Sequence, residues 1–367
     1  MQVGVSIIQY QPLKYSKEKT VEIPKTMRAS VLREVGVIEI EERPVPKPQA
    51  NEVLVKVAQV GVCGSDVHYY QHGRIGDFVV EQPLILGHEA SGVIVAVGSE
   101  VNPERIGERV SIEPQRSCRK CEFCRSGHYN LCPDMEFYAT PPIDGAFCEY
   151  VTIEEDFAFA LPDNISDAAG AMMEPLSVGI SACQKGGIKV NDTVLIAGAG
   201  PIGIMTLQCA LAFGAGRVVV SDISENRRQM ALSYGATEAV DPRTHNLDGL
   251  GAEVFIDCSG AEAAITAGIR ATRSGGTVVF VGSADVIPLS VPEVAMRELN
   301  VTGIFRYTQT WPIARHLLAS GKVDVDSLVT HAFGLDEVEL ALQPESTPNS
   351  LKRVVIPSVR TVENHER

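Results

Sequence analysis

The chain has 367 residues, of which 45% are apolar and 21% are charged. These fractions are close to globular averages, so a fibrous, low-complexity or wholly disordered protein is excluded, and the length favours two domains over one. Acidic residues outnumber basic ones by 46 to 32, which gives a net charge of −14 and disfavours nucleic acid and anionic membranes as partners.

The N-terminal segment and the cysteines indicate an intracellular protein. Gln9 and Gln11 interrupt the first apolar residues, no basic stretch precedes them, and no run reaches the ~20 apolar residues of a membrane span. We therefore expect no export signal and no membrane anchor, and we expect the nine cysteines to serve as thiols or metal ligands in the cytoplasm. Residues 1–26 show little periodicity and are expected to form an N-terminal extension.

From Met27 to about residue 160, short apolar segments alternate with glycine and proline. MRASVL and EVLVKVAQVGVC have the alternation of strands, and Pro44, Pro46 and Pro48 exclude a helix between them. This pattern predicts a mostly β domain. The tail after about residue 320 returns to short strands and turns, and we expect it to pack on this first domain.

The middle of the chain has a different pattern. The apolar segments VLIAG, RVVVSD, EVFIDCSG, TVVFVG and NVTGIF are separated by stretches of helical periodicity. Alternating strands and helices predict a doubly wound parallel sheet. The best defined crossover runs from a strand at 194–197 through a helix ending near Phe213 to a strand at 217–221. The next helix is expected between Ser224 and Gly235.

A glycine-rich turn joins the first strand of this sheet to its first helix. Gly198, Gly200 and Gly203 fit the pattern G-x-G-x-x-G. The first glycine permits the tight turn, the second lets the backbone approach a pyrophosphate, and the third lets the helix pack on the strand, while the helix N-terminus attracts phosphate. Asp222 ends the second strand, where a carboxylate can accept hydrogen bonds from a ribose hydroxyl. The unit predicts dinucleotide binding.

The acidic residue also distinguishes between dinucleotides. Asp222 would repel a 2′-phosphate, so the sequence favours NAD over NADP. Arg227 and Arg228 leave the alternative open, because an arginine near the ribose can accommodate that phosphate. Both arginines could equally lie on the solvated face of their helix.

One short segment is rich in cysteine. It contains Cys118, Cys121, Cys124 and Cys132. Its polar character argues against packed core thiols, and four thiolates suit a tetrahedral structural zinc that leaves no position for substrate. An iron–sulfur cluster is the nearest alternative, because Pro133 follows the last cysteine as in the bacterial ferredoxin motif. That motif has three residues before its final cysteine where this chain has seven, which favours zinc.

A second set of metal-binding residue types is dispersed over the segments CGSDVH, GHE and MEP. These segments contain Cys63, His88, Glu89 and Glu174. Each residue alone is more often part of a core, but thiolate, imidazole and carboxylate together form the ligand set of a catalytic zinc with one open position. Asp66 is expected to hold the tautomer of His88.

Taken together, these motifs resemble the zinc-dependent medium-chain dehydrogenase superfamily over about residues 27–358. CGSDVHYYQHGRIG, MEPLSVG, ATRSGGT and GIFRY followed by TWP are similar to its sorbitol (L-iditol) and xylitol dehydrogenase branch. In that branch, Glu174 stands where alcohol dehydrogenases carry a cysteine ligand. The resemblance implies an α/β protein with a GroES-like, mostly β catalytic domain at 27–178 and 318–367, and a doubly wound parallel-sheet Rossmann domain for NAD at 179–317.

The resemblance also implies two zinc ions per subunit, one catalytic and one structural, and roles for individual residues. The catalytic zinc would be bound by Cys63, His88 and Glu89, with Glu174 either binding it directly or holding its water. The positions that match polyol contacts in the branch are Tyr69, Phe137, Glu174, Arg306 and Tyr307. The positions that match NAD contacts or the glycine motif are Gly198, Gly200, Ile202, Gly203, Asp222, Arg227, Val281, Gly282 and Phe305.

The implied reaction oxidises a secondary hydroxyl of a polyol, such as sorbitol or xylitol, to a ketose. Zinc lowers the pKa of the bound alcohol, and the alcohol carbon releases hydride to NAD. Ser65 and His68 are candidates for passing the proton to solvent, although His68 could equally be an exposed residue at a strand end. Polar residues including Arg306, Tyr69 and Glu174 would supply the contacts that polyol hydroxyls need.

Other activities are also compatible with these residues. A related zinc dehydrogenase could act on L-arabinitol, threonine or butanediol. A non-catalytic nucleotide-binding protein is disfavoured because every expected zinc ligand is present. The expected partners are a small polyol or ketose substrate and other copies of the chain, since the branch's usual tetramer implies a homo-oligomer.

Overall fold

The computed structural model describes residues 22–283, 286–347 and 350–359. Contacts divide the described residues into two compact units. Unit 1 comprises the chain up to Arg125, Cys132–Glu174 and the chain from Asp326; unit 2 comprises Ser126–Leu131 and Pro175–Val325. Of the expected N-terminal extension, positions 1–21 lie outside the described residues. Residues 126–131, 175–178 and 318–325, which we expected in the first domain, group with unit 2.

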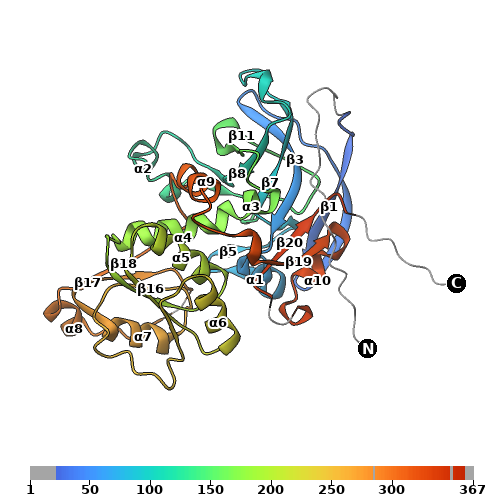
Figure 1. Ribbon diagram of the computed structural model, residues 1–367. Coiled ribbons are helices and arrows are strands. Elements are labelled where there is room, and N and C mark those ends of the chain that lie inside the picture. Colours follow the sequence, from blue (N-terminus) through green and yellow to red (C-terminus); the bar gives the residue numbers. More distant parts are fainter. Residues whose placement is uncertain (1–21, 284–285, 348–349, 360–367) are drawn as a thin grey trace. The chain divides into compact units, whose positions relative to one another are not determined.

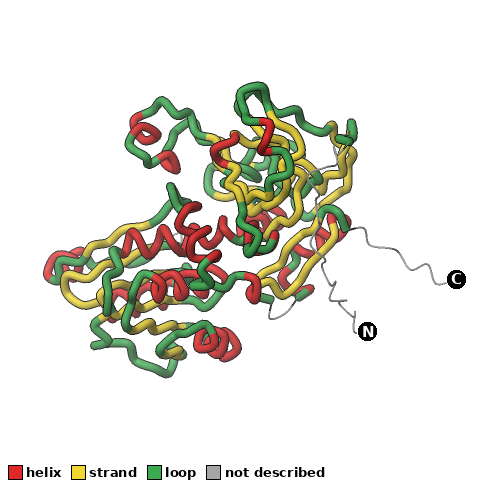
Figure 2. Tube along the Cα trace, turned by 45° about the horizontal axis from the view of Figure 1, so that its top comes forward, coloured by secondary structure: helices red, strands yellow, loops and turns green. Residues whose placement is uncertain are grey.

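Unit 1 consists mainly of strands, drawn in yellow in Figure 2. Its strands are β1 (Thr26–Glu34), β2 (Val37–Pro44), β3 (Glu52–Gly61), β4 (Arg74–Ile75), β5 (Phe78–Val79), β6 (Leu84–Ile85), β7 (Glu89–Val97), β8 (Arg109–Ile112), β9 (Gln115–Arg116), β10 (Glu136–Phe137), β11 (Tyr150–Glu154), β12 (Ala158–Ala160), β19 (Val329–Gly334) and β20 (Lys352–Ile356). Its helices are α1 (Gly64–His72), α2 (Glu122–Arg125), α3 (Asp167–Ala171) and α10 (Val338–Ala341).

The main sheet of unit 1 has the strand order β12-β8-β7-β3-β20-β19, and β11 also pairs with β3. The central strand β3 is almost wholly buried, as its run of valines predicts. β20 comes from the C-terminal tail and pairs antiparallel with β3. The last strands of the chain therefore complete the first unit, which confirms the expectation that the tail packs there.

Unit 2 alternates helices and strands along the chain. Its strands are β13 (Thr193–Ala197), β14 (Arg217–Ser221), β15 (Glu238–Val240), β16 (Ala252–Asp257), β17 (Thr272–Phe280) and β18 (Asn300–Gly303). Its helices are α4 (Met173–Gly186, which begins at the unit boundary), α5 (Pro201–Ala212), α6 (Glu225–Ser233), α7 (Glu262–Ala271), α8 (Val291–Met296) and α9 (Trp311–Ala319).

The sheet of unit 2 has the order β15-β14-β13-β16-β17-β18, and every neighbouring pair is parallel. This confirms the predicted doubly wound sheet. The helix expected to end near Phe213 is α5, whose C-cap is Phe213. The helix expected between Ser224 and Gly235 is α6, with Ser224 as its N-cap and Gly235 in the left-handed region at φ 98°.

Helices cover both faces of this sheet, with α4 and α5 on one side and α7 on the other (Figure 1). Successive residues of a strand point to opposite faces. On β16, the side chain of Val254 lies 2.7 Å from where a Cβ on Gly186 of α4 would stand, and the ring of Phe255 lies 2.1 Å from where a Cβ on Gly268 of α7 would stand. Both glycines thus let a helix approach the sheet closely.

Because the strands of unit 2 run in one direction, their carboxyl ends share one edge of the sheet. Ligands of such sheets bind at this edge. The expected cofactor residues follow β13, β14, β17 and β18, so the topology gathers them there. Within the part of the chain that the structure describes, we find no helix with the length and apolarity needed to cross a membrane.

Candidate metal and cofactor sites

The glycine turn between β13 and α5 has the geometry that its sequence predicts. Gly198 has φ +91°, a conformation that side chains disfavour. A Cβ on Gly203 would stand 1.9 Å from the carbonyl oxygen of Gly198, so the helix can pack this closely only with glycine there. Gly200 is the N-cap of α5, and a Cβ on it would meet nothing within 4 Å. The helix N-terminus is therefore open to a phosphate group.

Asp222 is fixed beside this turn by main-chain donors. Its Oδ2 accepts a hydrogen bond from Ala199 N and its Oδ1 one from Ser224 N, both at 2.8 Å. Each carboxylate oxygen has a second lone pair, so this arrangement leaves acceptors for a ribose hydroxyl. The acid that sequence reasoning singled out thus lies next to the amides of the glycine turn.

The two arginines after Asp222 are both partly buried. Arg228 Nη1 donates to Asp222 O at 2.8 Å and lies 3.5 Å from Asp241 Oδ2, and its side chain is 15% exposed. Burial lowers the pKa of the Arg227 guanidinium, although the charge of Asp222 partly opposes this shift. The alternative that Arg228 lies on the solvated face of its helix is therefore wrong, because its guanidinium contacts both Asp222 O and Asp241.

Other expected cofactor residues lie at the same edge of the sheet. Val281 N and Gly282 N both donate to Asp257 O at 2.9 Å, just after β17. A Cβ on Gly282 would stand 2.2 Å from Gly260 N, so only glycine fits there. Ile202 is half-buried, and Phe305 is 51% exposed after β18. All of these residues can line one surface above the carboxyl ends of the strands.

In unit 1, the structure brings together three of the four residues expected at the catalytic metal. Ligand atoms of Cys63, His88 and Glu89 all lie within 4.8 Å of one another. Cys63 is the N-cap of α1, His88 immediately precedes β7, and Glu89 is its first residue. Glu174 is buried in the first turn of α4 but does not belong to this group. A soft thiolate, an imidazole and a carboxylate fit zinc.

Asp66 lies next to two of these residues. Its Oδ1 is 3.6 Å from His88 Nδ1 and accepts from Gly87 N, and its Oδ2 accepts from Cys63 N, each hydrogen bond at 2.9 Å. Burial lowers the pKa of His88, but the charges of Asp66 and Cys63 outweigh it, and the net direction is upward. The group therefore attracts positive charge, which a metal cation can supply.

Sequence reasoning missed Lys352, which contacts the same group. Its Nζ lies 2.5 Å from Glu89 Oε1 and donates to Val62 O at 2.9 Å, and the residue is 4% exposed. Burial lowers the pKa of the Lys352 ammonium, but the charges of Glu89, Cys63 and Glu174 outweigh that effect and raise it. No local signal marks this lysine, because only the pairing of β20 with β3 brings it to Glu89.

The candidates for proton transfer lie on helix α1. Ser65 and His68 follow Cys63 within this helix, as does the expected substrate contact Tyr69, so the interpretation of His68 as a strand-end residue is wrong. The helix begins there because the side chain of Asp66, its third residue, caps the amide of Cys63. His68 is exposed, and its ring lies 4.5 Å from that of His72, whereas Tyr69 is buried.

The residues that we expect to contact the polyol are divided between the two units. In unit 1, the ring of Phe137 lies 5.5 Å from that of His88, beside the metal group. In unit 2, Arg306 has φ +56° and its guanidinium lies 4.9 Å from the Phe305 ring. Tyr307 is 1% exposed and packs edge-on against Trp311 at 5.1 Å.

The loop that carries Arg306 is anchored by the short segment Ser126–Leu131. Asn130 Nδ2 donates to Phe305 O at 2.8 Å, and Gln309 N donates to Tyr129 Oη at 2.8 Å. Thr308 Oγ1 donates to Gly127 O at 2.7 Å. These hydrogen bonds join residues about 180 positions apart in the chain and explain why the segment groups with unit 2.

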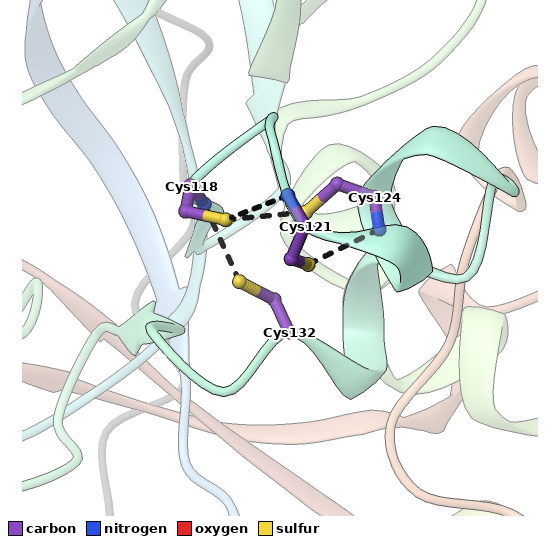
Figure 3. Close-up of side chains that lie close together, drawn as sticks. All are labelled: Cys118, Cys121, Cys124 and Cys132. Atoms are coloured by element: carbon purple, nitrogen blue, oxygen red, sulfur yellow. Dashed lines mark hydrogen bonds between the residues drawn. The ribbon is translucent and has the colours of Figure 1, made fainter.

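The four clustered cysteines converge on one point (Figure 3). Their sulfur atoms all lie within 4.8 Å of one another. The sulfur atoms of Cys118, Cys121 and Cys132 each accept a hydrogen bond from a main-chain amide. The amides of Lys120 and Cys121 lower the pKa of the Cys118 thiol to about 7, while burial raises the pKa of Cys132 to about 12. Such amide donors stabilise thiolates, and four thiolates fit a tetrahedral metal ion.

Comparisons with known proteins agree with the description of both units. The family model of the alcohol dehydrogenase GroES-like domain matches residues 49–163, and that of zinc-binding dehydrogenase matches residues 201–320. The sorbitol dehydrogenase of Bacillus subtilis is 43% identical over 331 residues, which cover 88% of this chain and 94% of the relative. That of Bos taurus is 45% identical over 331 residues, covering 87% and 93%.

A solved structure gives the same result at the level of the fold. The crystal structure of 2R,3R-butanediol dehydrogenase from Bacillus subtilis matches with a TM-score of 0.82 and 30% identity, over 90% of this chain and 99% of that one. The expected combination of a GroES-like and a Rossmann domain is therefore confirmed. The chain belongs to the zinc-dependent medium-chain dehydrogenase superfamily and, within it, to the sorbitol dehydrogenase family.

Proposed function

We propose that the chain is a zinc- and NAD-dependent polyol dehydrogenase that oxidises a secondary hydroxyl, as in sorbitol or xylitol, to a ketone. The observation that carries this proposal is the convergence of Cys63, His88 and Glu89 in one group, of which His88 and Glu89 are buried. Membership in the sorbitol dehydrogenase family supports the substrate class. The open turn at Gly200 supports the cofactor.

The residues of the metal group fit a catalytic zinc. Cys63, His88 and Glu89 would hold the ion, and Glu174 would either bind it directly or hold its water. When bound, zinc lowers the pKa of the substrate hydroxyl and so prepares the alcohol for loss of hydride. The four-cysteine cluster fits a second, structural zinc, since it offers no position for substrate.

The chain's own residues prepare this group for its task. Asp66 orients the imidazole of His88 through the contact of Oδ1 with Nδ1. It also accepts hydrogen bonds from the amides of Cys63 and Gly87 and so fixes the backbone at both ligands. The buried ring of Phe137 lies 5.5 Å from the imidazole of His88 and gives it an apolar neighbour. Ser65 and His68, one and four positions along α1 from its first residue, are our candidates for carrying the proton to solvent.

The proposed cofactor site lies at the carboxyl edge of the sheet in unit 2. The amides at Gly200 and the N-terminus of α5 would hold the pyrophosphate, and Asp222 would accept from the ribose. The engagement of Arg228 with Asp222 O and Asp241 supports NAD over NADP, since this arginine is not available to a 2′-phosphate. Ile202, Arg227, Val281, Gly282 and Phe305 complete the proposed contact surface.

We also propose a homo-oligomer, a tetramer, in the cytoplasm. β18 is an edge strand of the unit 2 sheet, and the apolar side chains of Leu289, Val291 and Met296 before it are exposed. An unpaired edge beside exposed apolar residues favours association with another copy. None of the nine cysteines is paired in a disulfide, which fits a reducing compartment. Sedimentation analysis of the purified protein tests the subunit number.

The experiment that tests the proposed function is NADH formation on a panel of alcohols, before and after dialysis against a strong chelator. The panel contains xylitol, sorbitol, L-arabinitol, threonine, butanediol and ethanol. We expect polyol turnover that chelation abolishes and zinc restores. Butanediol or threonine as the best substrate would assign the chain to a related dehydrogenase, and chelator-resistant turnover would refute the metal assignment.

Substrate binding by Arg306 is tested separately. A polyol hydroxyl that loses its partner costs about 1 to 3 kcal/mol, so Arg306→Ala should reduce polyol kcat/KM by roughly tenfold or more while the dissociation constant for NADH stays unchanged. Arg273→Ala, at an exposed position of β17, serves as the control. Equal losses in polyol turnover and NADH binding would reassign Arg306 to the cofactor.

A further inference from the structure

A buried lysine reaches the metal group from the far end of the chain. β3 lies between β7 and β20, and Gly61 on β3 is the cross-strand partner of Glu89 on one side and of Val354 on the other. Lys352 stands two residues before Val354 and so shares its face. Because Gly61 has no side chain, Lys352 and Glu89 can meet across it, and the Nζ to Oε1 distance is 2.5 Å.

The ion pair is costly to bury, which argues for a role beyond folding. Lys352 is 4% exposed and Glu89 is fully buried. Buried ion pairs are no better for stability than well-packed apolar residues, since both charges must leave water. The charges of Cys63 and Glu174 also favour the protonated form of Lys352, beside its direct contact with Glu89.

The two oxygens of Glu89 have different surroundings. Oε1 accepts from Lys352, whose ammonium also donates to Val62 O at 2.9 Å. Oε2 is buried and has no hydrogen-bond partner among the described residues. It lies 1.8 Å from where a Cβ on Gly61 would stand, so the missing side chain leaves room for it. A buried carboxylate oxygen without a donor is one that a cation can satisfy.

We propose that Lys352 is a positioning residue for the catalytic metal. By holding Oε1, it makes Glu89 present a single oxygen, Oε2, to the ion and prevents the carboxylate from binding through both oxygens. Its charge also offsets part of the negative charge of the group, to which Cys63, Glu89, Glu174 and the neighbouring Asp66 contribute. This role of Lys352 rests on the proposed function, in which Cys63, His88 and Glu89 hold a catalytic zinc.

The test compares Lys352→Met, which keeps an unbranched side chain of similar length but loses the charge, with Lys352→Arg, which keeps the charge. Lys189→Met is the control, because Lys189 is an exposed lysine of unit 2. For each protein we would load Co²⁺ and record its visible absorption, measure the zinc dissociation constant by competition with a chelator, and follow thermal unfolding with and without zinc.

Lys352→Met is expected to bind zinc at least about tenfold more tightly, because a neighbouring cation is gone and Glu89 gains a second contact with the metal. Its Co²⁺ bands should weaken, as they do when coordination number rises, and its metal-free form should melt at a lower temperature. Lys352→Arg and Lys189→Met should match the parent protein. If Lys352→Met does not fold, Lys352→Gln, neutral but polar, should show the same gain in zinc affinity.

The outcomes separate this proposal from the proposed function. Equal melting losses with and without zinc, together with an unchanged Co²⁺ spectrum and zinc affinity in Lys352→Met and Lys352→Gln, would overturn the role of Lys352 and leave only a structural ion pair. A parent protein that binds a single metal ion, at the four cysteines alone, would instead overturn the catalytic metal site itself.

Discussion

Asp66 Oδ1 lies 3.6 Å from His88 Nδ1 inside unit 1, and the same carboxylate accepts hydrogen bonds from the amides of Cys63 and Gly87. One side chain that is fully buried thus fixes the entry to helix α1 and the turn before β7. Both proposed ligands, the thiol and the imidazole, depend on it for their position.

Replacement of Asp66 should therefore weaken the metal site. We expect Asp66→Ala to lose about 10-fold to 100-fold in zinc affinity, as for other carboxylates that support a ligating histidine. Competition with a chelator measures this, and Asp77→Ala, at an exposed position, should leave the affinity unchanged. An Asp66→Ala protein that folds and binds zinc as tightly as the parent would exclude the proposed support of His88.

The space beside Gly61 gives a second prediction. Gly61→Ala places a Cβ 1.8 Å from Glu89 Oε2 and 2.6 Å from Met172 Cε, so the carboxylate must move. We expect a loss of about 1 to 3 kcal/mol in the free energy of unfolding and less than one zinc at the catalytic site. Gly64→Ala meets nothing within 4 Å and should keep both stability and zinc. Thermal unfolding and metal analysis of the two variants check this. If Gly61→Ala kept the stability and zinc content of Gly64→Ala, the predicted clash with Glu89 would be contradicted.

Two glycines of the cofactor turn should respond in opposite ways. Gly200→Ala adds a Cβ to open space, so we expect unchanged stability but NADH binding weakened by roughly tenfold or more, because the methyl group takes the place of a phosphate. Gly203→Ala puts its Cβ 1.9 Å from Gly198 O, which should lower the free energy of unfolding by about 1 to 3 kcal/mol. NADH fluorescence titration and denaturant unfolding separate the two effects. Tight NADH binding by Gly200→Ala would place the pyrophosphate elsewhere.

Cofactor preference should change when Asp222 loses its charge. Asp222→Asn keeps an acceptor near Ala199 but removes the repulsion of a 2′-phosphate, worth about 1 kcal/mol or more. We expect the ratio of kcat/KM for NAD to that for NADP to fall by roughly tenfold. Steady-state kinetics with both cofactors measure the ratio, and Asp248→Asn, at an exposed position, is the control. An unchanged ratio would show that groups other than Asp222 determine the preference for NAD over NADP.

The hydrogen bond from Asn130 to Phe305 O predicts an effect on polyol binding. Asn130→Ala removes one anchor of the loop that carries Arg306, a loss of about 0.5 to 1.5 kcal/mol. We expect KM for the polyol to rise roughly threefold to tenfold, with an unchanged zinc content. Tyr129→Phe, which removes the acceptor for Gln309 N, should act in the same direction. If KM stays constant in both variants, the loop does not need these anchors.

Much of the fold was predictable because its signals are local. The glycine pattern, Asp222 and the caps at Ser224 and Gly235 each depend on residues within one strand, turn or helix, and the structure places them as expected. The reading of His68 as a strand-end residue failed because the helix start depends on the side chain of Asp66 capping Cys63, which apolar periodicity does not reveal.

The sequence by itself determined the two architectures, the four-cysteine cluster and the types of residue at the catalytic metal group, since motif spacing and strand patterns carry this information. Only the tertiary structure decided which polar groups meet. Lys352 reaches Glu89 across 263 positions, and Asn130 reaches Phe305 across 175. Such contacts follow from strand register and loop packing, which are set by the burial of the whole unit rather than by neighbours in the chain.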